Sequence, residues 1–240
     1  LSGLRPRAAV LVATIRSLKM NGGVAKTELG AENIEALTRG AVNIQRHIEN
    51  LRGYGLPVLV ALNHFTSDTA AEVDTVKRIV ASMGAEAYVC RHWAEGGKGA
   101  EELAKAVIAT LARKQDDFHV LYDDTLPLLA KIEATAKRIY RADRVEASQK
   151  IIAQLKRWED AGFGRLPVCI AKTQYSFSTD PVKLGAPEGH VLDVREVRLS
   201  AGAGFVVAIC GDLMTMPGLP RAPAAELMSV DVDGNIHGLS

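Results

Sequence analysis

Two aromatic residues follow predicted strands at places where side chains could meet a ligand. Phe65 comes just after the apolar run 57–62, and Trp93 comes just after the run 86–90. Each directly follows a histidine, and neither belongs to an apolar period that would bury it. Because parallel strands bind ligands at their carboxyl ends, the two rings could hold a flat heteroaromatic molecule between them. On pattern alone, rings that only close the end of the sheet are slightly favoured.

Other predicted strand ends carry polar side chains. Asn63 directly follows the apolar run 57–62 and Asp68 comes five residues later, which is typical of loops that contact a purine base in nucleotide-binding α/β folds. The signal is weak, because both residue types are common in ordinary loops. Lys172 and Thr173 follow a later predicted strand, so their side chains would face the edge of the sheet as well.

Three further features allow more than one interpretation. The Gly/Ala-rich stretch 200–204 either approaches a ligand closely or packs tightly against a helix. Lys19 could reach an anion, although a solvated lysine is the commoner outcome. The segment 95–99 contains glycines and a lysine but not the G-x-x-x-x-G-K-S/T spacing of a phosphate-binding loop. We interpret it as a mobile loop, and the sequence lacks the loop that ATP chemistry needs.

Composition excludes several classes of function. The chain has 240 residues, 48% of them apolar and 24% charged, with a formal charge of +1. No dense Lys/Arg run supports binding to nucleic acid or to a membrane surface, and no apolar run is long enough to span a membrane. Cys90, Cys169 and Cys210 lie far apart in apolar runs, which predicts buried free thiols in the cytoplasm and no metal site.

The elements that would position these residues alternate over residues 1–120. The expected order is strand 8–13, helix 34–51, strand 57–62, helix 73–83, strand 86–90 and helix 103–111. This alternation predicts an α/β fold with a mostly parallel sheet and flanking helices. The first two strands are continuous apolar runs, so both are expected to be buried on both faces.

The rest of the chain changes character. Residues 121–162 contain two amphipathic patterns with no strand between them, which predicts a helical hairpin beside the sheet. Residues 163–240 predict a smaller C-terminal α/β portion with a strand at 166–171, a strand with one wet face at 191–199 and a buried strand at 205–209. The sequence DVDG at 231–234 predicts a hairpin turn.

Five stretches, in this order along the chain, resemble the formate–tetrahydrofolate ligase family. They are 12–23, 57–68, 167–178, 195–205 and 214–220. The likeness runs over the whole length, with Asn21 in place of the histidine expected there and a local variation at 210–212. The resemblance implies a P-loop-NTPase-like half without its P-loop.

The resemblance also implies a reaction and partners. Such enzymes use ATP, with Mg²⁺, to activate formate as formyl phosphate, and then pass the formyl group to N10 of tetrahydrofolate. The family's phosphate loop lies in an N-terminal part, so this chain is similar to roughly the C-terminal two-fifths of the enzyme. The start at Leu1, without Met and close to an apolar run, agrees with missing upstream sequence. The missing N-terminal part would be a partner, and the parent enzyme would be a homo-oligomer.

Residue roles follow only from the family. Phe65 and Trp93 would hold the pterin between them, with Val89 on the wall of the same pocket. The residues expected to lie toward the nucleotide are Asn63, Lys172, Thr173, Ser200 and Gly202. We assign no catalytic residue and no metal ligand.

The chain alone is expected to have no ligase activity, because the phosphate loop is missing, and to hold neither ATP nor tetrahydrofolate tightly. Two alternatives stay open. One is a stand-alone folate-binding protein, and the other is an oligomerisation module without catalysis.

Overall fold

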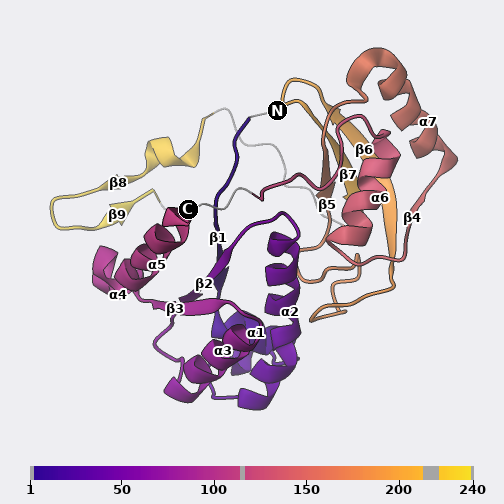
Figure 1. The fold of residues 1–240 in the computed structure, drawn as a ribbon. Coiled ribbons are helices and arrows are strands. Elements are labelled where there is room, and N and C mark those ends of the chain that lie inside the picture. The colour runs from indigo at the N-terminus through magenta and orange to yellow at the C-terminus, as the bar shows by residue number, and fades with distance from the viewer. Residues whose placement is uncertain (1–2, 114–116, 213–221, 239–240) are drawn as a thin grey trace.

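The computed structural model describes residues 3–113, 117–212 and 222–238. Two sheets stand side by side with helices packed on them, and a small two-stranded hairpin lies apart from both (Figure 1). The predicted segment 214–220 lies outside the described residues. Among the described residues, no helix combines the length and the apolar character needed to cross a membrane.

The first sheet is fully parallel, in the order β1-β2-β3, with β2 in the centre. Its strands are β1 (Ala9–Ala13), β2 (Val58–Asn63) and β3 (Glu86–Cys90). Its helices are α1 (Ile15–Asn21), α2 (Ile34–Arg52), α3 (Ala70–Ser82), α4 (His92–Glu95) and α5 (Glu101–Ala112), with short 3₁₀ turns at Lys26–Glu28 and Gly96–Ala100. The predicted alternation of strands and helices is confirmed.

The burial of the first two strands differs from the expectation in one case. β2 is buried on both faces, as predicted; it is the central strand, and α2 and α5 contact it. β1 is an edge strand, and Val10 and Val12 are 44% and 65% exposed. The prediction that β1 is buried on both faces is therefore wrong: an apolar run does not reveal which face its neighbours leave open.

The second sheet is mixed, in the order β4-β6-β7-β5. Its strands are β4 (Arg144–Ala147), β5 (Val168–Ala171), β6 (Val191–Ser200) and β7 (Phe205–Cys210), and its helices are α6 (Leu128–Arg138) and α7 (Gln149–Trp158), followed by a single π turn at Glu159–Phe163. Only the β6–β7 pair is antiparallel among the described strands of this sheet. Two predictions are confirmed: β6 has one solvent-exposed face, and β7 is a buried strand.

The expected helical hairpin at 121–162 is wrong, because β4 separates α6 from α7 and joins the second sheet beside β6. The sequence of β4, Arg-Val-Glu-Ala, gives no apolar run, since this short edge strand is largely exposed. Both helices pack on the core of the second sheet, where Ile132 and Leu155 meet Leu192.

The small hairpin near the end of the chain confirms the predicted turn. It consists of a 3₁₀ turn at Ala224–Leu227, then β8 (Ser229–Val230) and β9 (Ile236–His237). Asp231 N–H donates to the Asn235 carbonyl at 3.0 Å, and Gly234 has the positive φ of +84° that this turn requires.

Helix α2 lies between the two sheets (Figure 1). It begins at Asn33, whose side chain accepts a hydrogen bond from Ala36 N–H at 2.9 Å. One face contributes Leu37, Ala41, Ile44 and Ile48 to the core of the first sheet. Polar residues of α2 contact the second half of the molecule, the part from residue 121 on that contains the second sheet. Asn43 Nδ2 donates to the Gly185 carbonyl at 2.9 Å, and Asn50 Nδ2 donates to the Ile139 carbonyl at 3.0 Å. Arg46 forms an ion pair with Glu188.

The three cysteines are unpaired, as expected, but not all are buried. Cys90 and Cys210 are buried, whereas Cys169 is exposed. Cys169 lies on β5, an edge strand of the second sheet, and is the exposed residue of a strand whose other residues are half-buried. The predicted burial of Cys169 is wrong for the same reason as that of β1.

Candidate functional site

The carboxyl ends of β1, β2 and β3 form one edge of the first sheet, and the predicted aromatic residues lie there. Asn63, the last residue of β2, is paired with Cys90, the last residue of β3, so the loops that follow start side by side. Trp93 Nε1 donates to the carbonyl of His64 at 2.7 Å, which joins the two loops directly. Trp93 is 56% exposed and Phe65 is half-buried. The structure therefore brings Phe65 and Trp93 together at one sheet edge.

A pocket of about 510 Å³ opens beside these loops. Its lining comes from the ends of β2 and β3, from α3 and from the α4–α5 region, and it includes Val89, His64 and Asp68. The rings of Phe65 and Trp93 are not among the described residues that line it. The charged lining consists of Asp68, Asp74, Lys77, Arg91, Glu95, Lys98, Glu101 and Glu102. Carboxylates outnumber cations, so the pocket offers many acceptors to ligand N–H groups.

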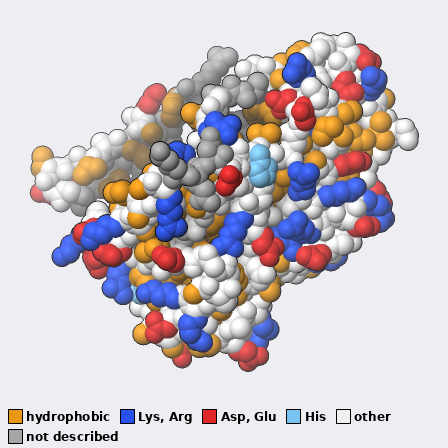
Figure 2. Space-filling view, viewed as in Figure 1, with side chains coloured by type: hydrophobic (Ala, Val, Ile, Leu, Met, Phe, Trp, Pro, Cys, Tyr) orange, Lys and Arg blue, Asp and Glu red, His pale blue; other side chains and the backbone are white. Residues whose placement is uncertain are grey.

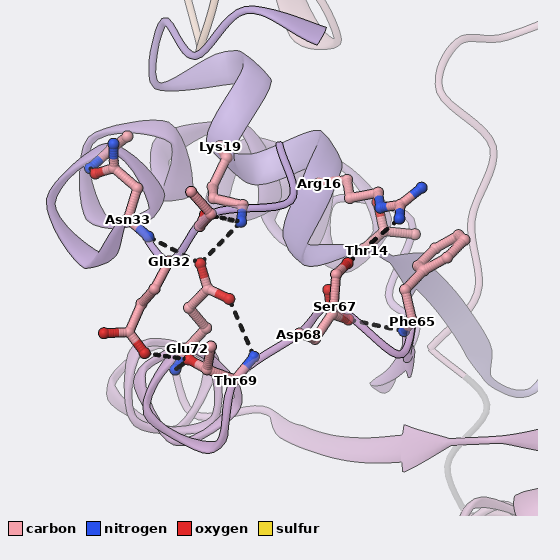
Figure 3. A network of polar contacts seen from close by, with 12 residues as sticks. Thr14, Arg16, Lys19, Glu32, Asn33, Phe65, Ser67, Asp68, Thr69 and Glu72 are labelled. Carbon is pink, nitrogen blue, oxygen red and sulfur yellow. Dashed lines mark hydrogen bonds and ion pairs between the residues drawn. The ribbon is translucent and has the colours of Figure 1, made fainter. Parts of the chain in front are cut away.

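The loop that carries Phe65 is held by hydrogen bonds between its own residues. Phe65 N–H donates to Asp68 Oδ2 at 2.9 Å, which closes the loop on itself (Figure 3). Thr69 then caps α3 in a capping box with Glu72, in which each side chain accepts from the other residue's backbone N–H. Phe65 is therefore placed by a tight turn that leads straight into a helix.

Arg16 covers Phe65 from the neighbouring strand end. Its guanidinium carbon lies 4.3 Å from the centre of the Phe65 ring, and Nη2 donates to Ser67 Oγ at 3.3 Å (Figure 3). Arg16 follows β1 by three residues, so the first two strands each place one of these planar groups at the edge. A cation over a ring is attracted by the ring's negative face.

Lys19 neither reaches an anion from solution nor lies in solvent, so both interpretations offered for it are wrong. It is wholly buried and forms an ion pair with Glu72, with 2.9 Å between Nζ and Oε1. Lys19 Nζ also donates to the Ala31 carbonyl at 2.8 Å. Glu72 further accepts from the backbone N–H groups of Asn33 and Thr69 at 3.0 and 3.2 Å. The pair thus connects α1, the segment before α2 and the start of α3.

The electrostatics of Glu72 follow from this network. Burial by itself raises the pKa of the carboxyl, but the hydrogen bonds from Lys19, Asn33 and Thr69 outweigh it, and the net pKa is lowered. Sequence reasoning missed the pair. The signal that could have found half of it is Thr-x-x-Glu at 69–72, the spacing of a capping box.

A second pocket, of about 740 Å³, lies between the two halves, and Lys172 and Thr173 line it together with His47 and Tyr140. Lys172 Nζ donates to the carbonyls of Thr173 and Ser176, and lies 4.8 Å from the centre of the Tyr140 ring. Burial lowers the pKa of Lys172 to about 8 and raises that of Tyr140 to about 12. Burial also lowers the pKa of His47, with Arg46 and Lys172 adding to the effect.

The other residues expected near a nucleotide lie elsewhere. Ser200 pairs with Phe205 at the start of β7, whereas Ala171, next to Lys172, pairs with Ile209 near the end of that strand. Ser200 and Gly202 are therefore at the opposite end of the second sheet from Lys172. A Cβ added at Gly202 would meet nothing within 4 Å, so no helix packs tightly there. Asn63 lies on the first sheet.

Segment 95–99, interpreted from sequence as a mobile loop, forms the end of α4 and a 3₁₀ turn. Arg91 N–H donates to the Gly99 carbonyl at 2.9 Å, and a Cβ on Gly99 would lie 2.5 Å from the carbonyl carbon of Arg91. Gly99 is thus required by close packing of the backbone. Among the described residues, no group of three or more His, Cys, Asp and Glu side chains is arranged to hold a metal ion.

Comparisons with known proteins match the whole chain. The family model for formate–tetrahydrofolate ligase matches residues 1–240. Curated proteins called formate–tetrahydrofolate ligase are similar to it: that of Allorhizobium ampelinum is 64% identical over 238 residues, and that of Paracoccus denitrificans is 61% identical over 239 residues. These alignments cover 99% and 100% of this chain but 43% of each relative. The chain thus spans about two-fifths of the length of these relatives.

Proposed function

Because the chain belongs to the formate–tetrahydrofolate ligase family, we propose that it provides the folate-binding part of such a ligase. The observation that carries this proposal is the meeting of Phe65 and Trp93 at one sheet edge, joined by the Trp93–His64 hydrogen bond. Aromatic rings at the carboxyl ends of parallel strands suit a flat ligand such as a pterin.

In this proposal the pterin enters between Phe65 and Trp93, with Val89 on the pocket wall. Val89 lines the pocket beside the two loops, in agreement with that role. The carboxylates of the lining can accept hydrogen bonds from the amino and ring N–H groups of a pterin. This site fixes the amine that attacks the formyl group, and holding two reactants in the right geometry removes much of the entropic barrier.

We place the nucleotide in the pocket between the two halves. Lys172 and Thr173 line the pocket between the halves, so they are suited to contact part of ATP. Asn63 is at the edge of the first sheet where we place the folate. Ser200 and Gly202 are at the end of the second sheet opposite Lys172. One bound nucleotide is therefore expected to contact Lys172 and Thr173 rather than all five residues.

The proposal includes the remaining requirements of the reaction. ATP, with Mg²⁺, activates formate, an N-terminal part of the polypeptide supplies the phosphate loop, and the complete enzyme acts in the cytoplasm as a homo-oligomer. The chain alone should not turn over ATP, formate and tetrahydrofolate, and should hold neither ATP nor tetrahydrofolate tightly. Acidic and basic side chains intermingle on the face shown in Figure 2, which agrees with a small-molecule ligand rather than nucleic acid.

The test is a titration of the chain with tetrahydrofolate, followed by tryptophan fluorescence. Trp158→Phe should keep a saturable quenching, because Trp93 remains as reporter, and Trp93→Phe should abolish the signal. Phe65→Ala should weaken binding by roughly tenfold or more, since an aromatic partner of a planar ligand contributes about 1–3 kcal/mol. Quenching that survives Trp93→Phe and vanishes in Trp158→Phe would contradict the assignment.

The edge strand β1 favours one alternative, an oligomerisation module. Val10 and Val12 are exposed on a strand whose outer edge is unpaired in this sheet. Sedimentation of the chain with and without tetrahydrofolate separates the two ideas. Association that is abolished by Val12→Lys, in a chain without folate binding, would support the module.

A further inference from the structure

We propose that Arg16 binds the phosphate group of the formyl donor, at the point where that donor meets the folate amine. The inference rests on the proposed function for its biological meaning, but the anion site itself does not. Arg16 would then be a substrate-binding residue that follows β1 and lies over the ring of Phe65.

The first observation is that Arg16 has no negative partner in the part of the chain that the structure describes. Among the described residues, no carboxylate oxygen lies within ion-pair distance of its guanidinium, and the only hydrogen bond of that group is the 3.3 Å contact with Ser67 Oγ. Nε of Arg16 is buried and has no hydrogen-bond partner. The Phe65 ring and Ser67 offset part of the desolvation cost of this half-buried guanidinium, but no opposite charge among the described residues does so.

The second observation is that the nearby carboxylates are already used. Asp68 accepts the Phe65 N–H through Oδ2, and Glu72 is paired with Lys19. Lys19 lies one turn further along the same helix and has both a carboxylate and a carbonyl partner. Figure 3 shows Arg16 pointing away from that pair, toward Phe65 and Ser67. One helix therefore presents a matched cation to the interior and an unmatched cation to the site.

The third observation concerns chemistry at this edge. The guanidinium is a planar fork of N–H donors that matches the oxygens of a phosphate. In formyl transfer the folate nitrogen forms a bond to the formyl carbon, and the bond from that carbon to the phosphate oxygen breaks. The phosphate leaves with the electron pair, and the nitrogen releases a proton. Arg16 would hold the phosphate before the step and stabilise the charge that it gains, which is where a preorganised cation has most effect.

A purely structural role is the competing explanation, because the guanidinium also stacks on Phe65. The two roles differ in their response to an anion. A stacking cation needs no anion, whereas an anion-binding group takes up phosphate even when no folate is present.

The test is a titration of the ¹⁵N-labelled chain with inorganic phosphate at constant ionic strength, followed by NMR of the arginine side-chain N–H signals. Comparison with Arg16→Lys identifies the Arg16 signal. We expect this signal to shift saturably with phosphate but not with chloride. We also expect Arg16→Gln to weaken phosphate binding by about tenfold or more, because hydrogen bonds to a charged group are lost.

Arg39→Gln is the matched control, since Arg39 is an exposed arginine that pairs with Glu35 on α2. It should leave phosphate binding unchanged. An unmoved Arg16 signal, or equal phosphate binding by the native chain and Arg16→Gln, would overturn the proposal. The titration contains no folate, so failure of the folate site and failure of the phosphate site are separate outcomes.

Discussion

The two halves of the molecule each bury a lysine completely, and they do so in different ways. Lys19, in the first half, is neutralised by Glu72 and also donates to one carbonyl. Lys131, in the second half, donates to the carbonyls of Gly164 and Leu166 at 2.8 and 2.9 Å. Among the described residues no carboxylate lies within ion-pair distance of Lys131, and burial lowers its pKa.

The difference shows what each lysine does. The Lys19–Glu72 pair fixes three segments around the loop that carries Phe65, so it serves the candidate site. Lys131 holds the backbone between the π turn and β5, at a place with no candidate site residue. The buried lysine with a carboxylate partner is thus the one that lies beside the loop of the candidate folate site.

The largest effect should come from breaking the ion pair on one side only. Lys19→Met leaves the Glu72 carboxylate buried without its cation, which costs about 3–5 kcal/mol of unfolding free energy. Urea denaturation measures this cost. The double variant Lys19→Met/Glu72→Gln should recover part of it, because the uncompensated charge is gone. If Lys19→Met costs less than about 1 kcal/mol, the pair contributes no more than a surface ion pair, and the contrast with Lys131 fails.

Lys131→Met should cost less, at most about 1–3 kcal/mol, because it removes two hydrogen bonds but also removes a buried charge that has no carboxylate partner among the described residues. The same urea experiment gives the value, and the two lysine variants can be compared directly. Equal costs for Lys131→Met and Lys19→Met would show that the carboxylate partner makes no difference.

The contributions of the two buried lysine sites to the free energy of unfolding should also depend on pH in different ways. The pKa of Glu72 is lowered in the folded state, so its stabilisation is complete above the unfolded value of about 4.5 and is lost as pH falls through the folded pKa. The pKa of Lys131 is lowered too, but for a cation this means that the folded state is penalised at neutral pH. Stability then rises as pH rises toward the unfolded value near 10.5.

Unfolding curves measured between pH 3 and 10 test both the acid-side and the alkaline-side prediction. The difference between the native chain and Lys19→Met/Glu72→Gln should shrink on the acid side, and the difference between the native chain and Lys131→Met should change on the alkaline side. Subtracting each variant removes contributions shared by both proteins, such as that of Cys210, whose pKa burial raises to about 12. A difference that is flat with pH would contradict the assigned titration.

The smallest effect is expected for an exposed lysine. Lys105 forms ion pairs with Glu101 and Glu102 on the surface of α5, where water and salt screen the charges. Lys105→Gln should not change the urea midpoint measurably. A clear loss of stability would mean that lysine pairing, rather than burial, explains the contrast between the two halves.

Much of this organisation could be predicted from the sequence. Periodicity placed the strands and helices of the first sheet, and the strand-end rule brought Phe65 and Trp93 to one edge before any contact was known. Short edge strands were the weak point: β4 has no apolar run, and the exposure of Val12 and Cys169 depends on which neighbours a strand has.

The polar part of the site was harder to predict, because each partner is distant in sequence. Glu72 lies more than fifty residues after Lys19, and only the fold brings them within 2.9 Å. The same holds for Arg16 and Phe65, which share a sheet edge because β1 and β2 are neighbours. A local pattern identifies the capping box at Thr69 but cannot identify the cation that completes it.

The position of α2 has a consequence for the order of folding. Its apolar face completes the first core, and its polar face receives Gly185 and Glu188 from the second half. Residues 9–90, which form the first sheet, leave the ribosome before residues 144–210, which form the second. The first half can therefore fold around α2 during synthesis and offer a finished surface, on which the second half assembles later.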